Sequence, residues 1–161
     1  MFSVIFPGQG SQMIGMGKEF YDKFDLVKNL FKEADDTLNF SISKLILEGP
    51  KEELDLTANT QPAIFLISYS IYSVIRMEFN IDLSKAKYFA GHSLGEFSAL
   101  VANKTLRFED GLKLVYQRAL AMQKACEIAP STMAAVLNLE DKTYPHGKKY
   151  KYRHFFFRSF L

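Results

Sequence analysis

The segment Gly91-His92-Ser93-Leu94-Gly95 carries residue types suited to acyl transfer. It matches G-x-S-x-G, the nucleophile elbow, in which a strand turns sharply into a helix and displays a serine hydroxyl above the sheet edge. An apolar strand pattern precedes the segment and an apolar helical pattern follows it, as an elbow requires. We therefore predict that Ser93 is a nucleophile; the alternative is an ordinary structural turn.

An oxyanion formed on an acyl group attacked by Ser93 would lie against the N–H of Leu94, at the start of the following helix. A second donor is needed, and the loop Pro7–Gln12 offers the N–H of Gln9 if the strand before it lies close to the elbow. Alone, this Gly-rich loop also matches a phosphate cradle or a plain turn. It lacks the Lys-Ser/Thr ending of a P-loop, which makes nucleotide binding a weak alternative.

Strands alternate with helices along the chain, which predicts an α/β layer fold with a largely parallel sheet. The predicted strands cover residues 3–7, 86–90 and 132–139. The predicted helices cover residues 16–24, 25–38, 62–79, 94–103 and 107–128, with short helical turns over 39–58. The third of these helices is expected to start at Pro62, with Thr60 or Gln61 near its N-cap, since proline favours the first helical position.

The composition is that of a soluble globular protein, because 48% of the 161 residues are hydrophobic and 24% are charged. We expect no signal peptide, and the longest apolar run, Ala63–Ile75, is too short to span a bilayer. Cys126 is the single cysteine, so no disulfide framework is expected and a cytoplasmic location is predicted. Its place on an apolar helical stripe predicts a buried hydrophobe rather than a nucleophile.

The last 18 residues differ from the rest, with seven aromatic residues, five basic ones and no acidic one. One interpretation is a tail that binds RNA or a membrane, because such tails interleave aromatic and basic side chains. The interpretation that we favour is a disordered or non-native end.

Four motifs, FPGQGSQ, NTQPA, GHSLGE and VYQRALAMQ, occur in the order and spacing of the malonyl-CoA:acyl carrier protein transacylases. The chain resembles this acyltransferase family, which also includes the loading domains of polyketide synthases, over about residues 2–139. The resemblance implies an α/β-hydrolase-like core over residues 1–130. It also implies that residues 131–140 are the first strand of a small ferredoxin-like subdomain, and it leaves residues 141–161 as an anomalous basic and aromatic tail.

The resemblance implies a role for each matching position. Ser93 would carry the acyl group as an ester, and the backbone N–H groups of Gln9 and Leu94 would form the oxyanion hole. The planar guanidinium of Arg118 would bind the free carboxylate of a malonyl group. Gln61 would line the pocket, and His92 would be a supporting neighbour rather than the catalytic base.

A serine hydroxyl needs a base within hydrogen-bond reach to act as a nucleophile, and the family's base is a histidine far downstream of residue 139. The histidines of this chain are His92, His146 and His154, and the last two lie in the anomalous tail. We therefore expect a fragment with an intact elbow and little activity.

The resemblance implies malonyl-CoA and a phosphopantetheinylated acyl carrier protein as substrates and partners, in fatty acid biosynthesis. No metal, no cofactor, no nucleic acid and no membrane partner is expected. The alternatives are an α/β-hydrolase-type esterase, which would not need Arg118, and a non-catalytic acyl-binding module. The family's downstream specificity positions are missing, so malonyl and methylmalonyl both stay open.

Overall fold

The computed structural model describes residues 2–79 and 81–128 of the chain. By its internal contacts the chain divides into residues 1–123 and residues 124–161, and the fold below is that of the first unit. The elements are β1 (Ser3–Phe6), α1 (Lys18–Lys23), α2 (Asp25–Leu38), α3 (Ile42–Glu48), α4 (Lys51–Leu54), α5 (Thr57–Met77), a 3₁₀ turn (Leu83–Lys85), β2 (Tyr88–Gly91), α6 (Gly95–Ala102) and α7 (Phe108–Ile128). The predicted strand over 132–139 and the basic and aromatic tail lie outside the described residues.

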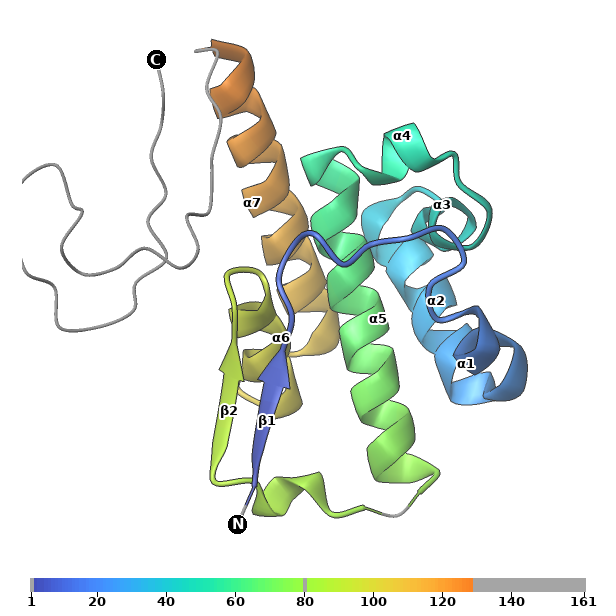
Figure 1. The fold of residues 1–161 in the computed structure, drawn as a ribbon, viewed down its shortest axis with the longest axis vertical. Helices are drawn as coiled ribbons and strands as arrows, with labels where there is room; N and C mark the ends of the chain where they lie inside the picture. Colours follow the sequence, from blue (N-terminus) through green and yellow to red (C-terminus); the bar gives the residue numbers. More distant parts are fainter. Residues whose placement is uncertain (1, 80, 129–161) are drawn as a thin grey trace, which may run out of the picture. The chain divides into compact units, whose positions relative to one another are not determined.

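The sheet pairs β1 with β2 in parallel, and Phe6 lies opposite Gly91 in the register (Figure 1). Helices α1 to α5 connect the two strands, as parallel pairing requires. The prediction of an α/β fold with parallel strands is confirmed. Because the strands are parallel and in register, the loop after Phe6 and the turn after Gly91 both leave the sheet at the carboxyl end of the strands.

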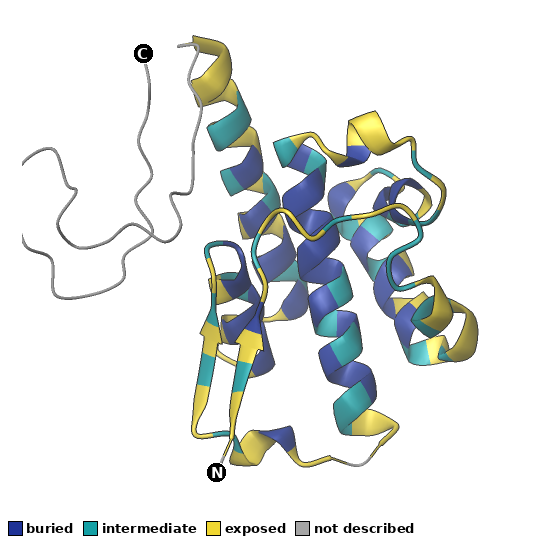
Figure 2. Cartoon of the chain, in the orientation of Figure 1, coloured by how far each residue is buried: buried dark blue, intermediate teal, exposed yellow. Residues whose placement is uncertain are grey.

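Helix α5 forms the centre of the core, packed between α2 and α6, and is buried along most of its length (Figure 2). The predicted start at Pro62 is wrong, because α5 begins at Thr57 and includes Pro62. A helical turn is already closed before the proline, since the carbonyl of Leu56 accepts from the N–H of Thr60 at 2.8 Å. Proline therefore costs the helix only one hydrogen bond near its beginning. None of the described helices has the length and apolar character needed to cross a membrane.

The apolar stripe of α7 on which Cys126 lies is buried only in part. Leu112, Val115 and Ala119 are buried, whereas Met122 is half-buried. Cys126 is exposed, so the prediction of a buried cysteine is wrong. The reason lies at Gln123, whose Oε1 accepts from the N–H of Ala58 at 3.2 Å and so joins α7 to the first turn of α5. Cys126 lies almost one helical turn beyond this contact.

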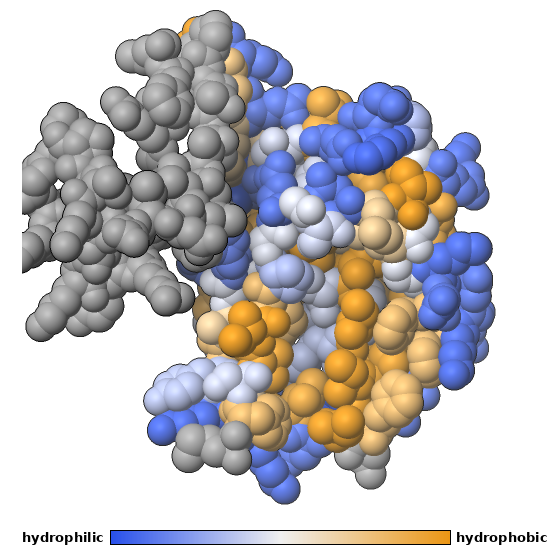
Figure 3. Space-filling model, viewed as in Figure 1, coloured by the Kyte–Doolittle hydropathy of each residue, from blue (hydrophilic) through white to orange (hydrophobic). Residues whose placement is uncertain are grey.

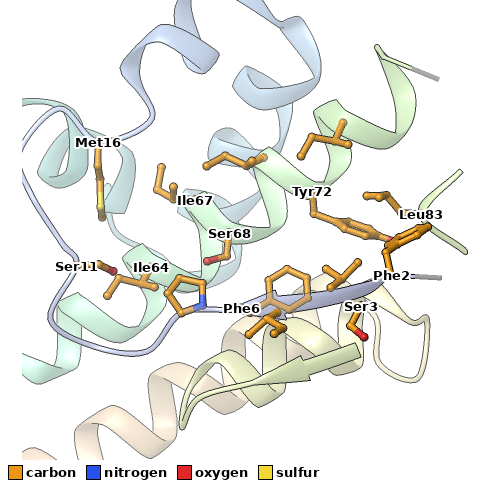
Figure 4. A pocket seen from close by; sticks show the side chains of 15 residues that line it. Phe2, Ser3, Phe6, Ser11, Met16, Ile64, Ile67, Ser68, Tyr72 and Leu83 are labelled. Carbon is orange, nitrogen blue, oxygen red and sulfur yellow. The ribbon is translucent and has the colours of Figure 1, made fainter. Parts of the chain in front are cut away.

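An apolar groove with a volume of about 420 Å³ runs between β1 and α5 (Figures 3 and 4). Its lining includes Phe2, Phe6, Ile67 and Tyr72. Beside the groove, β1 has an edge that is not paired with another strand of the described residues. The carbonyls of Phe2 and Phe6 accept hydrogen bonds from the segment of β2, whereas the backbone N–H and carbonyl groups of the alternate residues point away from β2. The side chain of Ile5, on the same strand, is 75% exposed.

We predict that the 161-residue chain self-associates and binds a hydrophobic dye, because the described residues leave both an apolar groove and a strand edge uncovered. Sedimentation and dye fluorescence would measure this. Ile5→Lys should reduce the association, whereas Leu114→Lys, at an exposed apolar position of α7 away from the groove, should not. A monomer without dye binding that unfolds cooperatively would contradict the prediction.

Candidate active site

Ser93 lies at the tip of a sharp turn between β2 and α6. Its φ angle is 55°, in the left-handed region that residues with a side chain rarely adopt. The N–H of Gly95 closes the turn by donating to the carbonyl of His92 at 2.9 Å. The backbone conformation of Ser93 costs about 1–2 kcal/mol, and strain of this kind is found where a side chain must be displayed for function. The helix that follows begins at Gly95, one residue later than predicted.

The two glycines of the motif are required for close packing rather than for positive φ angles. A Cβ on Gly91 would overlap the carbonyl group of Gly95. A Cβ on Gly95 would lie 2.5 Å from the carbonyl oxygen of Phe6, in the neighbouring strand. The positive φ angle of the turn belongs to Ser93 and not to either glycine. The glycines let β1, β2 and α6 approach at one point.

The loop after β1 lies beside the elbow, as predicted. The ring of His92 packs so closely on Gly8 that a Cβ there would overlap it. Within the loop, Gln12 accepts from the N–H of Gly10 at 3.0 Å through Oε1 and donates to Asp55 at 3.0 Å through Nε2. Lys51 and Gln12 both hydrogen-bond the Asp55 carboxylate and lower its pKa, Lys51 more strongly. The loop is thus anchored to the segment between α4 and α5.

Arg118 and Gln61 meet Ser93 in one polar cluster. Arg118 Nη2 donates to Ser93 Oγ at 2.8 Å, and Arg118 Nη1 donates to Gln61 Oε1. Gln61 Nε2 lies 3.4 Å from Gln9 Oε1, to which it donates. The structure therefore brings together four of the predicted site residues, which come from the loop after β1, from α5, from the elbow and from α7.

The two predicted oxyanion donors belong to the same region. Among the described residues, neither the backbone N–H of Leu94 nor that of Gln9 donates a hydrogen bond. Leu94 is the N-cap of α6, so its N–H belongs to the positive end of that helix. Their role in stabilising an oxyanion stays a prediction.

Sequence reasoning missed three side chains that support this cluster. Thr57 Oγ1 accepts from Gln9 Nε2 at 3.4 Å, and Met122 Sδ accepts from Gln61 Nε2 at 3.4 Å. Gln12 is the anchor of the loop described above. A signal was present for two of them, because Thr57 precedes Gln61 by four residues on α5 and Met122 follows Arg118 by four on α7, which places each pair on one helix face.

The charge of Arg118 is not neutralised by the part of the protein that the structure describes. Its side chain is half-buried, and no carboxylate of those residues lies within ion-pair distance of it. Partial burial strengthens the attraction of such a group for an anion. In residues 2–79 and 81–128, no cluster of three or more His, Cys, Asp or Glu side chains is arranged to hold a metal ion. The arrangement is thus suited to an anionic acyl group placed next to a serine hydroxyl.

Residues 3–148 match the family model described as the acyl transferase domain. The chain belongs to this family. A malonyl CoA-acyl carrier protein transacylase of Bacillus subtilis is 46% identical over 132 residues, which are 82% of this chain and 32% of that protein.

Solved structures of the same family resemble this chain. The acyl carrier protein S-malonyltransferase of Vibrio cholerae has a TM-score of 0.79 and 38% identity over 87% of this chain and 45% of its own. A malonyl-transacylase in complex with its type II polyketide synthase acyl carrier protein has a TM-score of 0.70 and 40% identity over 77% of this chain and 39% of its own. The chain therefore spans less than half the length of these relatives.

We predict that Gly95→Ala disrupts the fold around the elbow, because the new Cβ meets the Phe6 and Pro7 carbonyl oxygens at 2.5 and 2.7 Å, and these are backbone atoms. Overpacking of this kind costs about 1–3 kcal/mol or more. The matched control is Glu96→Ala, at the next, exposed position of α6. Urea unfolding of the two variants would measure the difference, and equal stabilities would contradict the packing role of Gly95.

Proposed function

We propose that this chain is the N-terminal part of a malonyl-CoA:acyl carrier protein transacylase of fatty acid biosynthesis. The observation that carries the proposal is the 2.8 Å hydrogen bond from Arg118 to Ser93 Oγ. Membership of the acyl transferase family and the names of its relatives support the same reaction.

The short distance between Arg118 and Ser93 favours a short carboxylated acyl group. An acyl group esterified to Ser93 has its carbonyl carbon next to Oγ. A carboxylate one carbon beyond that carbonyl, as in malonyl, lies within reach of the adjacent guanidinium. Acetyl lacks the carboxylate altogether, and the extended chain of succinyl places its carboxylate farther from Ser93 Oγ.

The reaction would proceed in two acyl exchanges. In the first, Ser93 Oγ attacks the thioester carbonyl of malonyl-CoA while a base takes the hydroxyl proton. The carbon–sulfur bond breaks, and coenzyme A leaves as its thiol with that proton. In the second, the phosphopantetheine thiol of the carrier protein gives its proton to the base and attacks the ester carbonyl. The bond between the carbonyl carbon and Ser93 Oγ breaks, and Oγ takes the proton back from the base. The N–H groups of Gln9 and Leu94 would stabilise the oxyanion in both exchanges.

The proton acceptor is proposed to be a histidine outside residues 2–79 and 81–128, since His92 packs against Gly8. His92 would instead support the elbow, and Gln61 would line the acyl pocket. We also propose that the parallel strands and the elbow form part of an α/β-hydrolase-like core. The proposed reaction exchanges an acyl group between thiols and a hydroxyl, which needs no redox cofactor, and a reducing cytoplasm is consistent with a lone cysteine.

An esterase is the weaker candidate for this site. It would need the elbow and the oxyanion donors, but not a half-buried guanidinium hydrogen-bonded to its nucleophile. The position of Arg118 therefore favours transfer of a carboxylated acyl group.

Selectivity for the acyl group tests the proposal. In a chimera of residues 1–128 with the remaining C-terminal part of the Bacillus subtilis relative, malonyl-CoA should be used in preference to acetyl-CoA and succinyl-CoA. Arg118→Ala should remove a charge-assisted contact of about 2–4 kcal/mol, so malonyl transfer falls and acetyl transfer rises relative to it. An unchanged malonyl preference in the variant would refute the role of Arg118.

The 161-residue chain itself is predicted to be nearly inactive in malonyl transfer. Nucleophile and base act as a unit, so a serine without its base loses on the order of 10⁴-fold in rate. Ser93→Ala should then change the residual rate little. Substantial turnover that Ser93→Ala abolishes would reveal a base within the chain, and His146→Ala and His154→Ala would identify it.

A further inference from the structure

We propose that Gln61 is a positioning residue that holds the Arg118 guanidinium against Ser93 while leaving its positive charge available to the acyl group. The inference rests on the proposed function and adds a specificity device to it. Its basis is the set of contacts made by the buried amide of Gln61. A carboxylate at the same position would also accept the hydrogen bond from Arg118.

The amide of Gln61 is fixed on both sides. Gln61 is only 1% exposed. Oε1 accepts from Arg118 Nη1, while Nε2 donates to Gln9 Oε1 and to Met122 Sδ, each at 3.4 Å. A buried amide with a partner for both ends has one stable orientation, because rotating it would place two donors against the guanidinium.

This orientation determines where Arg118 points. The guanidinium is a planar fork, so a contact that holds Nη1 also sets the direction of Nη2. Gln61 holds Nη1, and Nη2 reaches Ser93 Oγ at 2.8 Å. Without Gln61, a half-buried arginine has many rotamers through which it reaches solvent. The amide therefore keeps the guanidinium next to the nucleophile before any substrate binds.

The neutrality of Gln61 is the second part of the proposal. A glutamate of the same size would also accept from Nη1, but it would form an ion pair with Arg118 in a partly buried site. A substrate carboxylate would then have to compete with a carboxylate already in place. With glutamine, no carboxylate of the described residues pairs with Arg118. An amide at position 61 can thus position the Arg118 guanidinium without neutralising its charge.

Two substitutions separate these two parts. Gln61→Glu keeps the size and the acceptor but adds a charge, whereas Gln61→Met keeps the approximate size and removes the acceptor. The full 161-residue chain and both variants would be treated with phenylglyoxal, and modification of Arg118 would be followed by peptide mass spectrometry. Arg107, which is exposed and paired with Asp110, gives an internal reference in the same digest.

We expect Gln61→Glu to slow modification of Arg118 relative to Arg107 by about tenfold, the size of one charge-assisted contact. Gln61→Met should accelerate it several-fold, because the guanidinium is no longer held. Malonyl-CoA should protect Arg118 in the unsubstituted chain, acetyl-CoA should protect it less, and neither should add protection in Gln61→Glu.

The outcomes distinguish this inference from the proposed function. Equal protection of the unsubstituted chain by malonyl-CoA and acetyl-CoA would contradict the proposed function, while the relative labelling rates would still test the hold of Gln61 on Arg118. Equal relative rates in all three chains would overturn the inference. It would also be overturned if both variants lost the helical circular dichroism of the unsubstituted chain, since Gln61 would then be a structural residue. If only Gln61→Met unfolds, the isosteric Gln61→Glu decides the outcome.

Discussion

The site depends on the close approach of β1 to the turn that carries Ser93. The carbonyls of Phe6 and Pro7 pass so near Gly95 that no side chain has room there. This contact and the parallel register of β1 and β2 bring the Gln9 loop to the elbow. A larger residue at Gly91 or Gly95 would separate the loop from Ser93. The two predicted oxyanion donors, the N–H groups of Gln9 and Leu94, would then no longer lie close together.

Around this backbone contact, residues 2–79 and 81–128 hold the positive charge of Arg118 without supplying a carboxylate partner for it. Arg118 is held by one neutral amide and one hydroxyl. Elsewhere in the described chain, the ion pairs join residues three or four positions apart on exposed surfaces, where each contributes little to stability. Arg118 differs from the residues of these pairs because its guanidinium contacts Ser93 and not a carboxylate. An anionic substrate would therefore be its partner.

The sequence predicted which motif residues lie close together better than it predicted the boundaries of the elements. Ser93, Arg118, Gln61 and Gln9 were identified from motifs, and they meet in the structure. The start of α5 was misplaced because a proline marks the first turn of many helices. Here the helix begins earlier, since the carbonyl of Leu56 and the side chain of Gln123 accept hydrogen bonds from N–H groups that precede the proline. Cys126 was misplaced because periodicity indicates which face of a helix is apolar but not how far along the helix that face is covered. The partners of Gln9 and Gln12 depend on how the loop folds over α4 and α5, which no local pattern encodes.

The most direct test of this account is to locate the acyl group on the protein. The chimera of residues 1–128 with the C-terminal part of the Bacillus subtilis relative would be mixed with malonyl-CoA, quenched in acid, digested and examined by mass spectrometry. The account predicts a hydroxylamine-sensitive malonyl ester on the peptide that contains Ser93, formed in much lower yield from acetyl-CoA. An acyl group attached elsewhere, or equal yields from malonyl-CoA and acetyl-CoA, would contradict it.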